Sequence, residues 1–226
     1  MKRSKKFLVG SLGTWIRFRN RETNGEQRLK KKIGIDLDGT VANFILGASQ
    51  VIKENFGHEP DLSKGFWGMD EIFNLVPGTF HRDMKDFIYK EKRLFRSLDK
   101  LEEDNHLLTS ALYEAIPDLH VYIVTARPTC IEVVEDTRLW IKENGFLCHG
   151  IHHADDKASL CVEKGISVMI EDQVNHITDL SDRGIDVIVM DQPWNRDLDQ
   201  ALHEQKARIR RVNNWREAFV AAKELL

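Results

Sequence analysis

The segment that most constrains the fold of this chain is Lys32–Phe44, which reads KIGIDLDGTVANF. An apolar run, Ile33–Ile35, leads directly into Asp36, and Asp38 and Gly39 follow it closely. This pattern is typical of a buried strand that ends in two acidic side chains and a tight turn. In α/β proteins, ligands bind at the carboxyl ends of parallel strands. The segment therefore predicts an α/β fold with two carboxylates where chemistry is usually done.

The rest of the chain continues an alternation of strands and helices. The predicted strands are Ile33–Leu37, Val121–Thr125, His149–Ala154, Ser167–Ile170 and Val187–Met190. Helical patterns cover Thr129–Asn144, Asp155–Lys164, Gln173–Arg183 and Trp215–Leu226. Strands that alternate with helices predict a Rossmann-like three-layer sandwich, in which right-handed crossovers connect the strands of a parallel sheet.

One connection in this pattern is unusually long. Residues 45–118 separate the first two predicted strands, which is too long for an ordinary loop. The segment contains two helical patterns, Ile45–Phe56 and Phe80–Glu91, so we expect a small helical cap inserted after the first strand. The predicted division is a basic N-terminal extension (1–31), a catalytic core (32–44 and 119–226) and the cap (45–118).

Charge and composition argue against several classes of protein. A net charge of −3 does not favour duplex nucleic acid as the main partner, and no apolar run approaches the ~18 residues of a membrane span. The three cysteines lack disulfide-framework spacing, which fits a reducing compartment. The basic first thirty residues lack a clear signal-peptide cleavage site. We expect a cytoplasmic protein without a membrane partner or a stable nucleic-acid partner. A transit peptide, or an extension that contacts anionic substrate, is a weaker alternative.

Polar side chains follow four of the predicted strands. They are Asp36 and Asp38 after the first, Thr125 after the second, Lys157 after the third, and Glu171 with Asp172 after the fourth. Parallel, adjacent strands would bring all of them to one crevice. Carboxylates suit a hard cation such as Mg²⁺, and a hydroxyl and an ammonium group suit phosphate. The sequence therefore predicts a site for a phosphorylated small molecule.

This set of groups can transfer a phosphoryl group. One carboxylate can attack phosphorus and form an aspartyl phosphate. A second carboxyl group can protonate the leaving oxygen and then deprotonate the attacking water. Lys157, Thr125 and Mg²⁺ would neutralise the charge on the phosphoryl oxygens.

The same residues carry a resemblance to a known superfamily. DLDGTV resembles the first motif of the haloacid dehalogenase-like (HAD) phosphohydrolases, and IVTAR resembles their second motif. Lys157 resembles the third motif and IED the fourth, in matching order across Lys32–Leu226. The resemblance implies that Asp36 is the nucleophile and a metal ligand, and that Asp38 is the general acid/base with its main-chain carbonyl on Mg²⁺. The implied phosphate-binding residues are Thr125, Ala126, Arg127 and Lys157, and the implied further metal ligands are Asp172 and Glu171.

Within the superfamily, the chain resembles the 5′(3′)-deoxyribonucleotidases of the cytosolic type C nucleotidase-like family. VANF resembles that group's VLADF, KGFWGMD its GFW segment, and MDQPWNR a motif of its bacterial relatives. The resemblance implies that Phe44, Phe66 and Trp67 stack on a nucleobase, typically worth ~1–3 kcal/mol per base. It departs at Ala126, because a serine follows the threonine in the mammalian members. The implied activity is Mg²⁺-dependent hydrolysis of nucleoside monophosphates.

Several alternatives remain open. The residues with two interpretations are Lys164 as a competitor of Lys157, Glu171 and Asp172 as helix caps, Arg127 as the partner of an acid, Phe66 and Trp67 as cap core, and Asn195 with Arg196 as a turn rather than the site rim. The substrate could instead be a sugar phosphate or a nucleic-acid 3′-phosphate end. A non-catalytic binding module on the same scaffold is a further rival, and a homodimer is also open.

Overall fold

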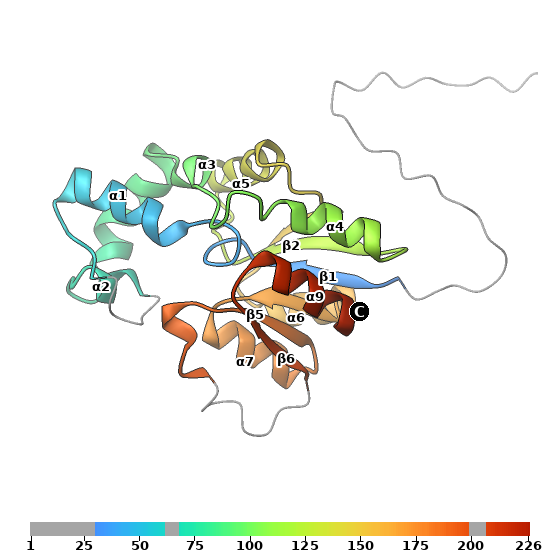
Figure 1. Ribbon diagram of the computed structural model, residues 1–226. Coiled ribbons are helices and arrows are strands. Elements are labelled where there is room, and N and C mark those ends of the chain that lie inside the picture. Colours follow the sequence, from blue (N-terminus) through green and yellow to red (C-terminus); the bar gives the residue numbers. More distant parts are fainter. Residues whose placement is uncertain (1–29, 62–67, 199–206) are drawn as a thin grey trace, which may run out of the picture.

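The architecture is a parallel sheet between two layers of helices (Figure 1). The computed structural model describes residues 30–61, 68–198 and 207–226. Within these ranges, six parallel strands lie in the order β3-β2-β1-β4-β5-β6. The strands are β1 (Lys32–Ile35), β2 (His120–Thr125), β3 (Gly150–His153), β4 (Val168–Glu171), β5 (Asp186–Met190) and β6 (Ile209–Val212). The predicted α/β class with a parallel sheet is confirmed, and β6 is a strand that the sequence analysis missed.

The helices predicted for the sheet region are found to within about two residues at most ends, and the helix Leu107–Ala115 was not predicted. In the sheet region they are α4 (Leu107–Ala115), α5 (Ile131–Glu143), α6 (Lys157–Lys164), α7 (Val174–Asp182), the 3₁₀ turn η3 (Pro193–Asn195) and α9 (Trp215–Leu225). One buried cluster joins α4, α5 and α9 to one face of the sheet, and a second joins α6 and α7 to the other. Figure 1 shows α4 and α5 above the sheet and α7 below it.

β1 lies at the centre of the sheet, between β2 and β4. Its Ile33 and Ile35 are fully buried on the face that α4, α5 and α9 cover. Gly34 points to the opposite face, where an added Cβ would lie 2.5 Å from the sulfur of Met169 and 3.3 Å from Val124. The glycine therefore lets the second cluster pack directly against the central strand.

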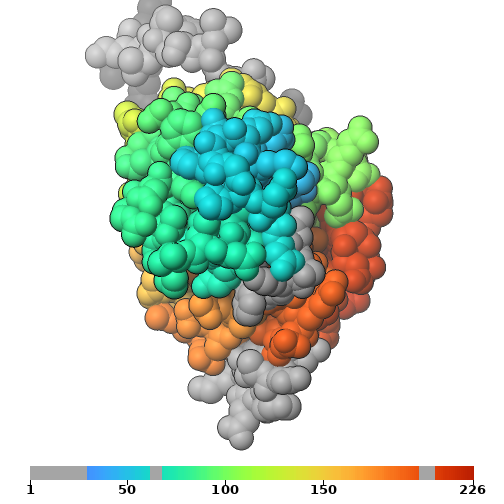
Figure 2. Space-filling view, turned by 90° about the vertical axis from the view of Figure 1, so that its left-hand side faces the viewer, coloured from blue at the N-terminus to red at the C-terminus, as the bar shows by residue number. Residues whose placement is uncertain are grey.

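The segment between β1 and β2 is helical, as predicted. It contains α1 (Phe44–Phe56), α2 (Met69–Ile72), two π-helical turns, η1 (Phe80–Met84) and η2 (Phe87–Glu91), and α3 (Leu94–Ser97). Figure 2 shows this segment, coloured blue to green, over the upper part of one face, above the orange surface of α7 and the residues that follow it. Phe44 and Phe95 belong to the same buried cluster as β1, and α4 packs against α9. The division of the chain into cap and core stays a prediction.

Some expectations fall on residues that the structure does not describe. The predicted basic extension lies almost entirely within residues 1–29, and the predicted base-stacking residues Phe66 and Trp67 lie within residues 62–67. Among the described helices, none combines the length and the apolar character that crossing a membrane requires.

Candidate active site

The turn after β1 presents two acidic side chains at the carboxyl edge of the sheet. The amides of Thr40, Val41 and Ala42 all donate to the carbonyl of Leu37, which folds the chain tightly back on itself. Gly39 occupies this turn at φ +83°, a region that L-residues rarely adopt. The turn therefore needs its glycine, and it leaves Asp36 buried with only 4% of its surface exposed.

Lys157 is the cation that meets Asp36. It is the first residue of α6, and its Nζ lies 2.7 Å from Asp36 Oδ1 and 2.8 Å from Glu171 Oε2. Burial alone would lower the pKa of Lys157, but the two carboxylates outweigh it and raise that pKa. The ammonium group therefore stays charged. The competing candidate, Lys164, ends the same helix and pairs with the neighbouring Glu163 instead.

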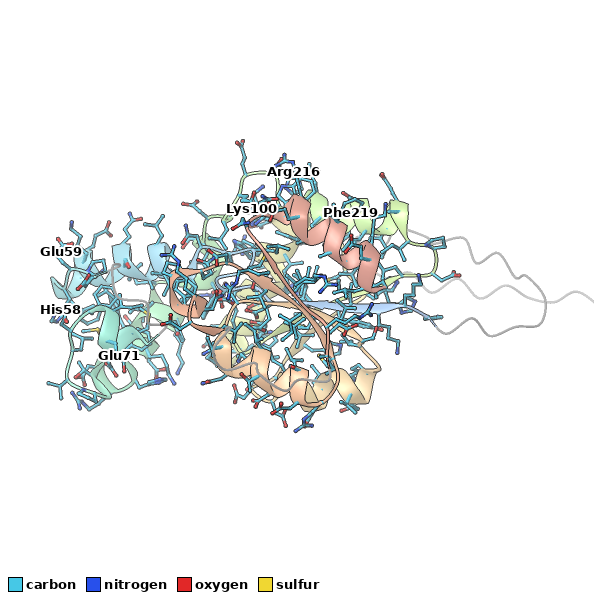
Figure 3. All side chains as sticks on the ribbon, turned by 60° about the horizontal axis from the view of Figure 1, so that its bottom comes forward. His58, Glu59, Glu71, Lys100, Arg216 and Phe219 are labelled. Carbon is cyan, nitrogen blue, oxygen red and sulfur yellow. The ribbon has the colours of Figure 1, made fainter. Side chains whose placement is uncertain are left out.

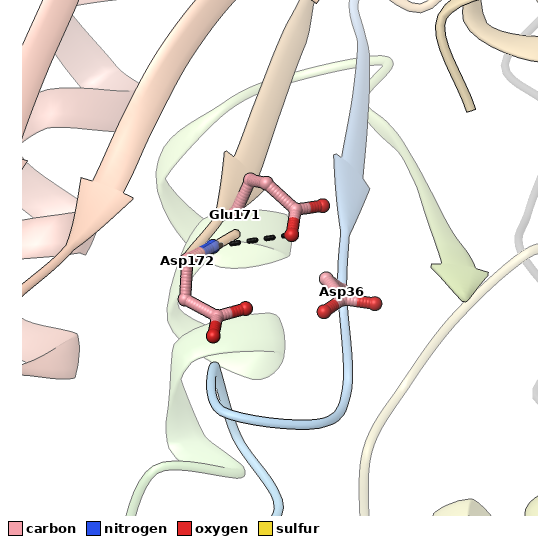
Figure 4. Close-up of side chains that lie close together, drawn as sticks. All are labelled: Asp36, Glu171 and Asp172. Atoms are coloured by element: carbon pink, nitrogen blue, oxygen red, sulfur yellow. Dashed lines mark hydrogen bonds between the residues drawn. The ribbon is translucent and has the colours of Figure 1, made fainter. Parts of the chain in front are cut away.

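Three carboxylates converge beside this lysine (Figure 4). Asp36, Glu171 and Asp172 each offer an oxygen, and these oxygens lie within 4.8 Å of one another. Burial, followed by Glu171, raises the pKa of Asp36 to about 7 against the opposing charge of Lys157. Burial, followed by Glu171 and Asp36, raises the pKa of Asp172 well above its usual value. The positive charge of Lys157 is therefore too small to keep all three carboxyl groups fully ionised.

The two acids at the end of β4 have different surroundings. Glu171 uses one oxygen for Lys157 and accepts the amides of Asp172 and Gln173 with the other, at 3.2 and 3.1 Å. Its hydrogen bonds therefore hold the lysine and the strand end. Asp172 accepts one hydrogen bond on each oxygen, from Thr40 and Trp194. The residue at the helix cap position of α7 is Gln173 rather than either acid.

Asp38 is held by an arginine. Arg127 donates through Nε to Asp38 Oδ2 at 2.7 Å and through Nη2 to Oδ1 at 2.6 Å. The guanidinium lies over the ring of Phe95, 4.5 Å from its centroid, and the arginine side chain is only 1% exposed. Of the two roles left open for Arg127, the structure shows the pairing with an acid. Its predicted contact with phosphate stays a prediction.

A cavity of about 330 Å³ joins these groups. Its polar lining consists of Asp36, Asp38, Asp70, Glu71, His81, Thr125, Arg127, Lys157, Asp172 and Gln173, and Ala126 also lines it. Its aromatic lining consists of Phe44, Phe80, Tyr89 and Phe95. Figure 3 shows Glu71 of α2 in the left-hand part of the molecule, away from Arg216 and Phe219 of α9. The cavity therefore connects the strand ends to the inserted segment.

The aromatic lining includes residues that the sequence analysis did not single out. Phe44 was predicted, and its ring stacks on that of Phe95 at 5.8 Å with an interplanar angle of 16°. Tyr89 lies 4.7 Å from Phe95, ring centroid to ring centroid. Only the helical pattern of Phe80–Glu91 pointed to this region. Phe80 and Tyr89 were missed because that pattern does not indicate which aromatic side chains face a cavity.

The donor set fits a divalent cation. The site has four carboxylates, on Asp36, Asp38, Glu171 and Asp172, and two cations, on Lys157 and Arg127. A cation of charge two would balance the surplus, and oxygen ligands are those that Mg²⁺ prefers. Across the described ranges, Asp36, Glu171 and Asp172 form the one group of three or more His, Cys, Asp or Glu residues with metal-binding geometry.

A comparison with models of protein families shows to which family the chain belongs. The model described as "5' nucleotidase, deoxy (Pyrimidine), cytosolic type C protein" matches residues 30–225. The chain belongs to the cytosolic type C 5′-nucleotidase family. A search of curated proteins found no match to this chain. The family match confirms the predicted relationship to the nucleotidase-like HAD phosphohydrolases, and solved structures of HAD hydrolases share the fold of the chain. Because the matched family consists of 5′-nucleotidases, the chain is a phosphohydrolase.

Three of those structures show how far the similarity to this nucleotidase-family chain extends. A haloacid dehalogenase-like hydrolase from Streptococcus pneumoniae is 16% identical, with a TM-score of 0.59, and the alignment covers 85% of this chain and 98% of that one. CbbY from Rhodobacter sphaeroides, in complex with phosphate, is 18% identical (TM-score 0.54; 87% and 100% covered). The HAD-hydrolase YfnB from Bacillus subtilis, bound to magnesium, is 15% identical (TM-score 0.53; 87% and 100% covered). At these identities the likeness concerns the fold.

Proposed function

We propose that the protein is a Mg²⁺-dependent phosphatase that hydrolyses nucleoside monophosphates. One observation carries the proposal: a single cavity is lined by Asp36 and Lys157 and also by an aromatic group of side chains. The first two suit a phosphate group, and the aromatic rings suit a base. The matched family is described as a deoxy (pyrimidine) 5′-nucleotidase, which supports the same class of substrate.

The aromatic lining supports a nucleobase rather than a small sugar. Phe44 and Phe95 are almost fully buried, Tyr89 packs against both of them, and Phe80 packs against Tyr89. Stacking on such rings is typically worth ~1–3 kcal/mol per base and tolerates different bases. A cavity of about 330 Å³ lies within the usual range of about 300–1,000 Å³ for small-molecule sites. The predicted contributions of Phe66 and Trp67 remain part of the proposal.

In the first step, Asp36 acts as the nucleophile. A carboxylate oxygen forms a bond to phosphorus, the bond from phosphorus to the nucleoside oxygen breaks, and Asp38 gives a proton to that oxygen. Lys157 and Thr125 hold the phosphoryl oxygens and stabilise their charge. The nucleoside leaves, and Asp36 carries the phosphoryl group.

In the second step, water releases the phosphate. Asp38 takes a proton from the water, whose oxygen bonds to phosphorus while the bond from Asp36 to phosphorus breaks. Inorganic phosphate leaves, Asp36 returns to a carboxylate, and Asp38 is protonated again. Asp36 is buried, and its electrostatic contacts are therefore stronger than they would be in bulk water.

The residues that would hold Mg²⁺ are Asp36, Asp172 and the main-chain carbonyl of Asp38, with Glu171 as a further candidate. When bound, the ion would supply positive charge that stabilises the phosphoryl oxygens. Glu171 contacts the ammonium group of Lys157 with one oxygen and two main-chain amides with the other, so we propose that its main task is to position Lys157.

Arg127 has a distinct place in this scheme. Both oxygens of Asp38 accept hydrogen bonds from its guanidinium, an arrangement that suits a carboxylate. We propose that this pair orients Asp38 as the base of the second step. One of the two hydrogen bonds has to open before Asp38 can carry a proton to the leaving oxygen.

We also propose a location and a domain role. The family description names a cytosolic protein, and the three cysteines are free, which supports a reducing, cytoplasmic location. Residues 45–118 would act as a cap that supplies the aromatic part of the cavity.

A phosphate-release assay tests the proposal. The panel contains ribo- and deoxynucleoside 5′- and 3′-monophosphates, sugar phosphates and 3′-phosphorylated oligonucleotides, each with Mg²⁺ or with EDTA. We expect the nucleoside monophosphates to be the best substrates, only with Mg²⁺, and Asp36→Asn to be inactive. A preference for sugar phosphates or oligonucleotide ends would replace the substrate class. No activity on the whole panel would favour a binding module.

A further inference from the structure

The carboxylate of Asp172 contacts a tryptophan side chain that has no role in the proposed reaction steps. The indole Nε1 of Trp194 donates to Asp172 Oδ2 at 2.9 Å, and the hydroxyl of Thr40 donates to Oδ1 at 3.2 Å. Asp172 is fully buried, so no bulk water competes for these oxygens. The two hydrogen bonds therefore determine how the carboxylate is oriented.

The turn that carries Trp194 is itself firmly held. Asn195 is fully buried, and its Nδ2 donates to the main-chain carbonyls of Asp172 and Met190, both at 2.8 Å. Arg211 of β6 donates to Asn195 Oδ1 at 2.6 Å and to its carbonyl at 2.9 Å. The missed strand β6 thus supports the turn, and the turn supports the end of β4. Of the two interpretations given for this motif, the residues form a turn, with Arg196 exposed.

The turn after β1 leaves space for the same contact. A Cβ on Gly39 would lie 2.2 Å from Asp172 Oδ2 and 3.1 Å from Cζ2 of Trp194. The carbonyl of Gly39 also accepts a hydrogen bond from Gln192 Nε2 at 2.8 Å. The loop that carries Asp36 and the turn that carries Trp194 are therefore packed around one carboxylate oxygen.

We propose that Trp194 is a positioning residue that orients Asp172 for Mg²⁺ and thereby sets the affinity of the site for the ion. The inference rests on the proposed function, because it takes Asp172 as a metal ligand. An indole N–H donates but does not accept, so Trp194 holds the carboxylate without competing for the cation. Removing such an outer partner of a metal ligand typically weakens metal binding about 10–100-fold.

The test is Trp194→Phe, which keeps an aromatic ring and removes the N–H donor. Trp215→Phe is the matched control, since Trp215 Nε1 donates to Asp104 Oδ1 at 2.7 Å in another part of the molecule. Isothermal titration calorimetry measures Mg²⁺ binding to each full-length protein after EDTA treatment. We expect about 10-fold weaker binding for Trp194→Phe and unchanged binding for the control. At saturating Mg²⁺, kcat and KM of Trp194→Phe should return to the wild-type values.

The outcomes separate this inference from the proposed function. Wild-type protein that binds Mg²⁺ no better than Trp194→Phe overturns the positioning role alone, and so does a kcat that saturating Mg²⁺ does not restore. Wild-type protein that binds no Mg²⁺ overturns the Mg²⁺ dependence together with it. If Trp194→Phe does not fold, NMR titration of the wild type decides. Mg²⁺ should shift the indole N–H resonance of Trp194 but not that of Trp215, and an unmoved Trp194 resonance refutes the inference.

Discussion

The ionised carboxylate of Asp36, the proposed nucleophile, should destabilise the folded protein when no metal ion is bound. Asp36 is 4% exposed, and burial together with Glu171 raises its pKa from 3.8 to about 7, a rise that Lys157 only partly opposes. Ionised Asp36 is therefore costly in the absence of a metal ion. Asparagine has nearly the same shape, carries no charge and retains an oxygen for Lys157. We expect Asp36→Asn to remove this cost together with the activity.

The sign and the size of the effect follow from the two pKa values. Between pH 3.8 and about 7, folded protein keeps a proton on Asp36 that the unfolded chain has released, so stability falls as the pH rises through this window. A window of about three pH units, at about 1.4 kcal/mol each, corresponds to about 4 kcal/mol. In metal-free buffer, Asp36→Asn should be about 4 kcal/mol more stable than wild type at pH 8 and nearly equal to it at pH 4.

Urea denaturation in EDTA, from pH 4 to pH 8, measures this difference. Asp155→Asn, a change at an exposed acid in the loop before α6, controls for the loss of one negative charge. Mg²⁺ should narrow the gap, because ligand binding stabilises the wild-type fold. A difference that does not grow with pH, or an Asp36→Asn protein that is less stable than wild type at pH 8, would refute the reasoning.

Three further predictions concern other charged groups. Lys157→Met leaves buried acids without their cation and should lower the free energy of unfolding in EDTA at pH 8 by about 3–5 kcal/mol, measured with urea; an unchanged value contradicts this. Arg127→Lys loses the two-point contact with Asp38 and should lower kcat about 10–100-fold at unchanged KM in steady-state kinetics; an unaltered kcat speaks against orientation by the arginine. Burial, followed by Lys157, lowers the pKa of His176 to about 4. The unfolded chain then binds a proton that folded protein does not, so stability should fall by about 2 kcal/mol from pH 6.5 to pH 4. His176→Gln should abolish this fall in urea unfolding, and a persisting fall would exclude His176 as its source.

Local patterns account for what the sequence predicted well. The apolar run before Asp36 and the later runs Ser167–Ile170 and Val187–Met190 belong to β1, β4 and β5, which are almost entirely buried, so continuous apolar residues mark them. Parallel strands all end at one edge, which is why Lys157 and Asp172 could be expected beside Asp36 before any contact was known. In the structure, Lys157 forms an ion pair with Asp36, and an oxygen of Asp172 lies within 4.8 Å of an oxygen of Asp36.

The sequence did not predict several other features of the structure, for physical reasons. β6, with the sequence IRRV, is an edge strand that carries two arginines, and it therefore lacks a long apolar run. Tyr89 and Phe95 sit among many aromatic side chains of the inserted segment, and no period distinguishes the ones that line a cavity. Trp194 follows a proline in what reads as a plain turn, although its N–H reaches Asp172.

The sequence by itself determined the parallel α/β class, the acidic turn after β1 and the set of groups at the strand ends, because these depend on neighbouring residues and on a general rule of topology. Only the tertiary structure decided the pairings: Asp38 with Arg127, which are 89 positions apart, Lys157 with both Asp36 and Glu171, and Asp172 with Trp194. Such pairings depend on distances of a few ångströms between distant segments. Those distances arise from packing, which the order of residues along the chain does not display.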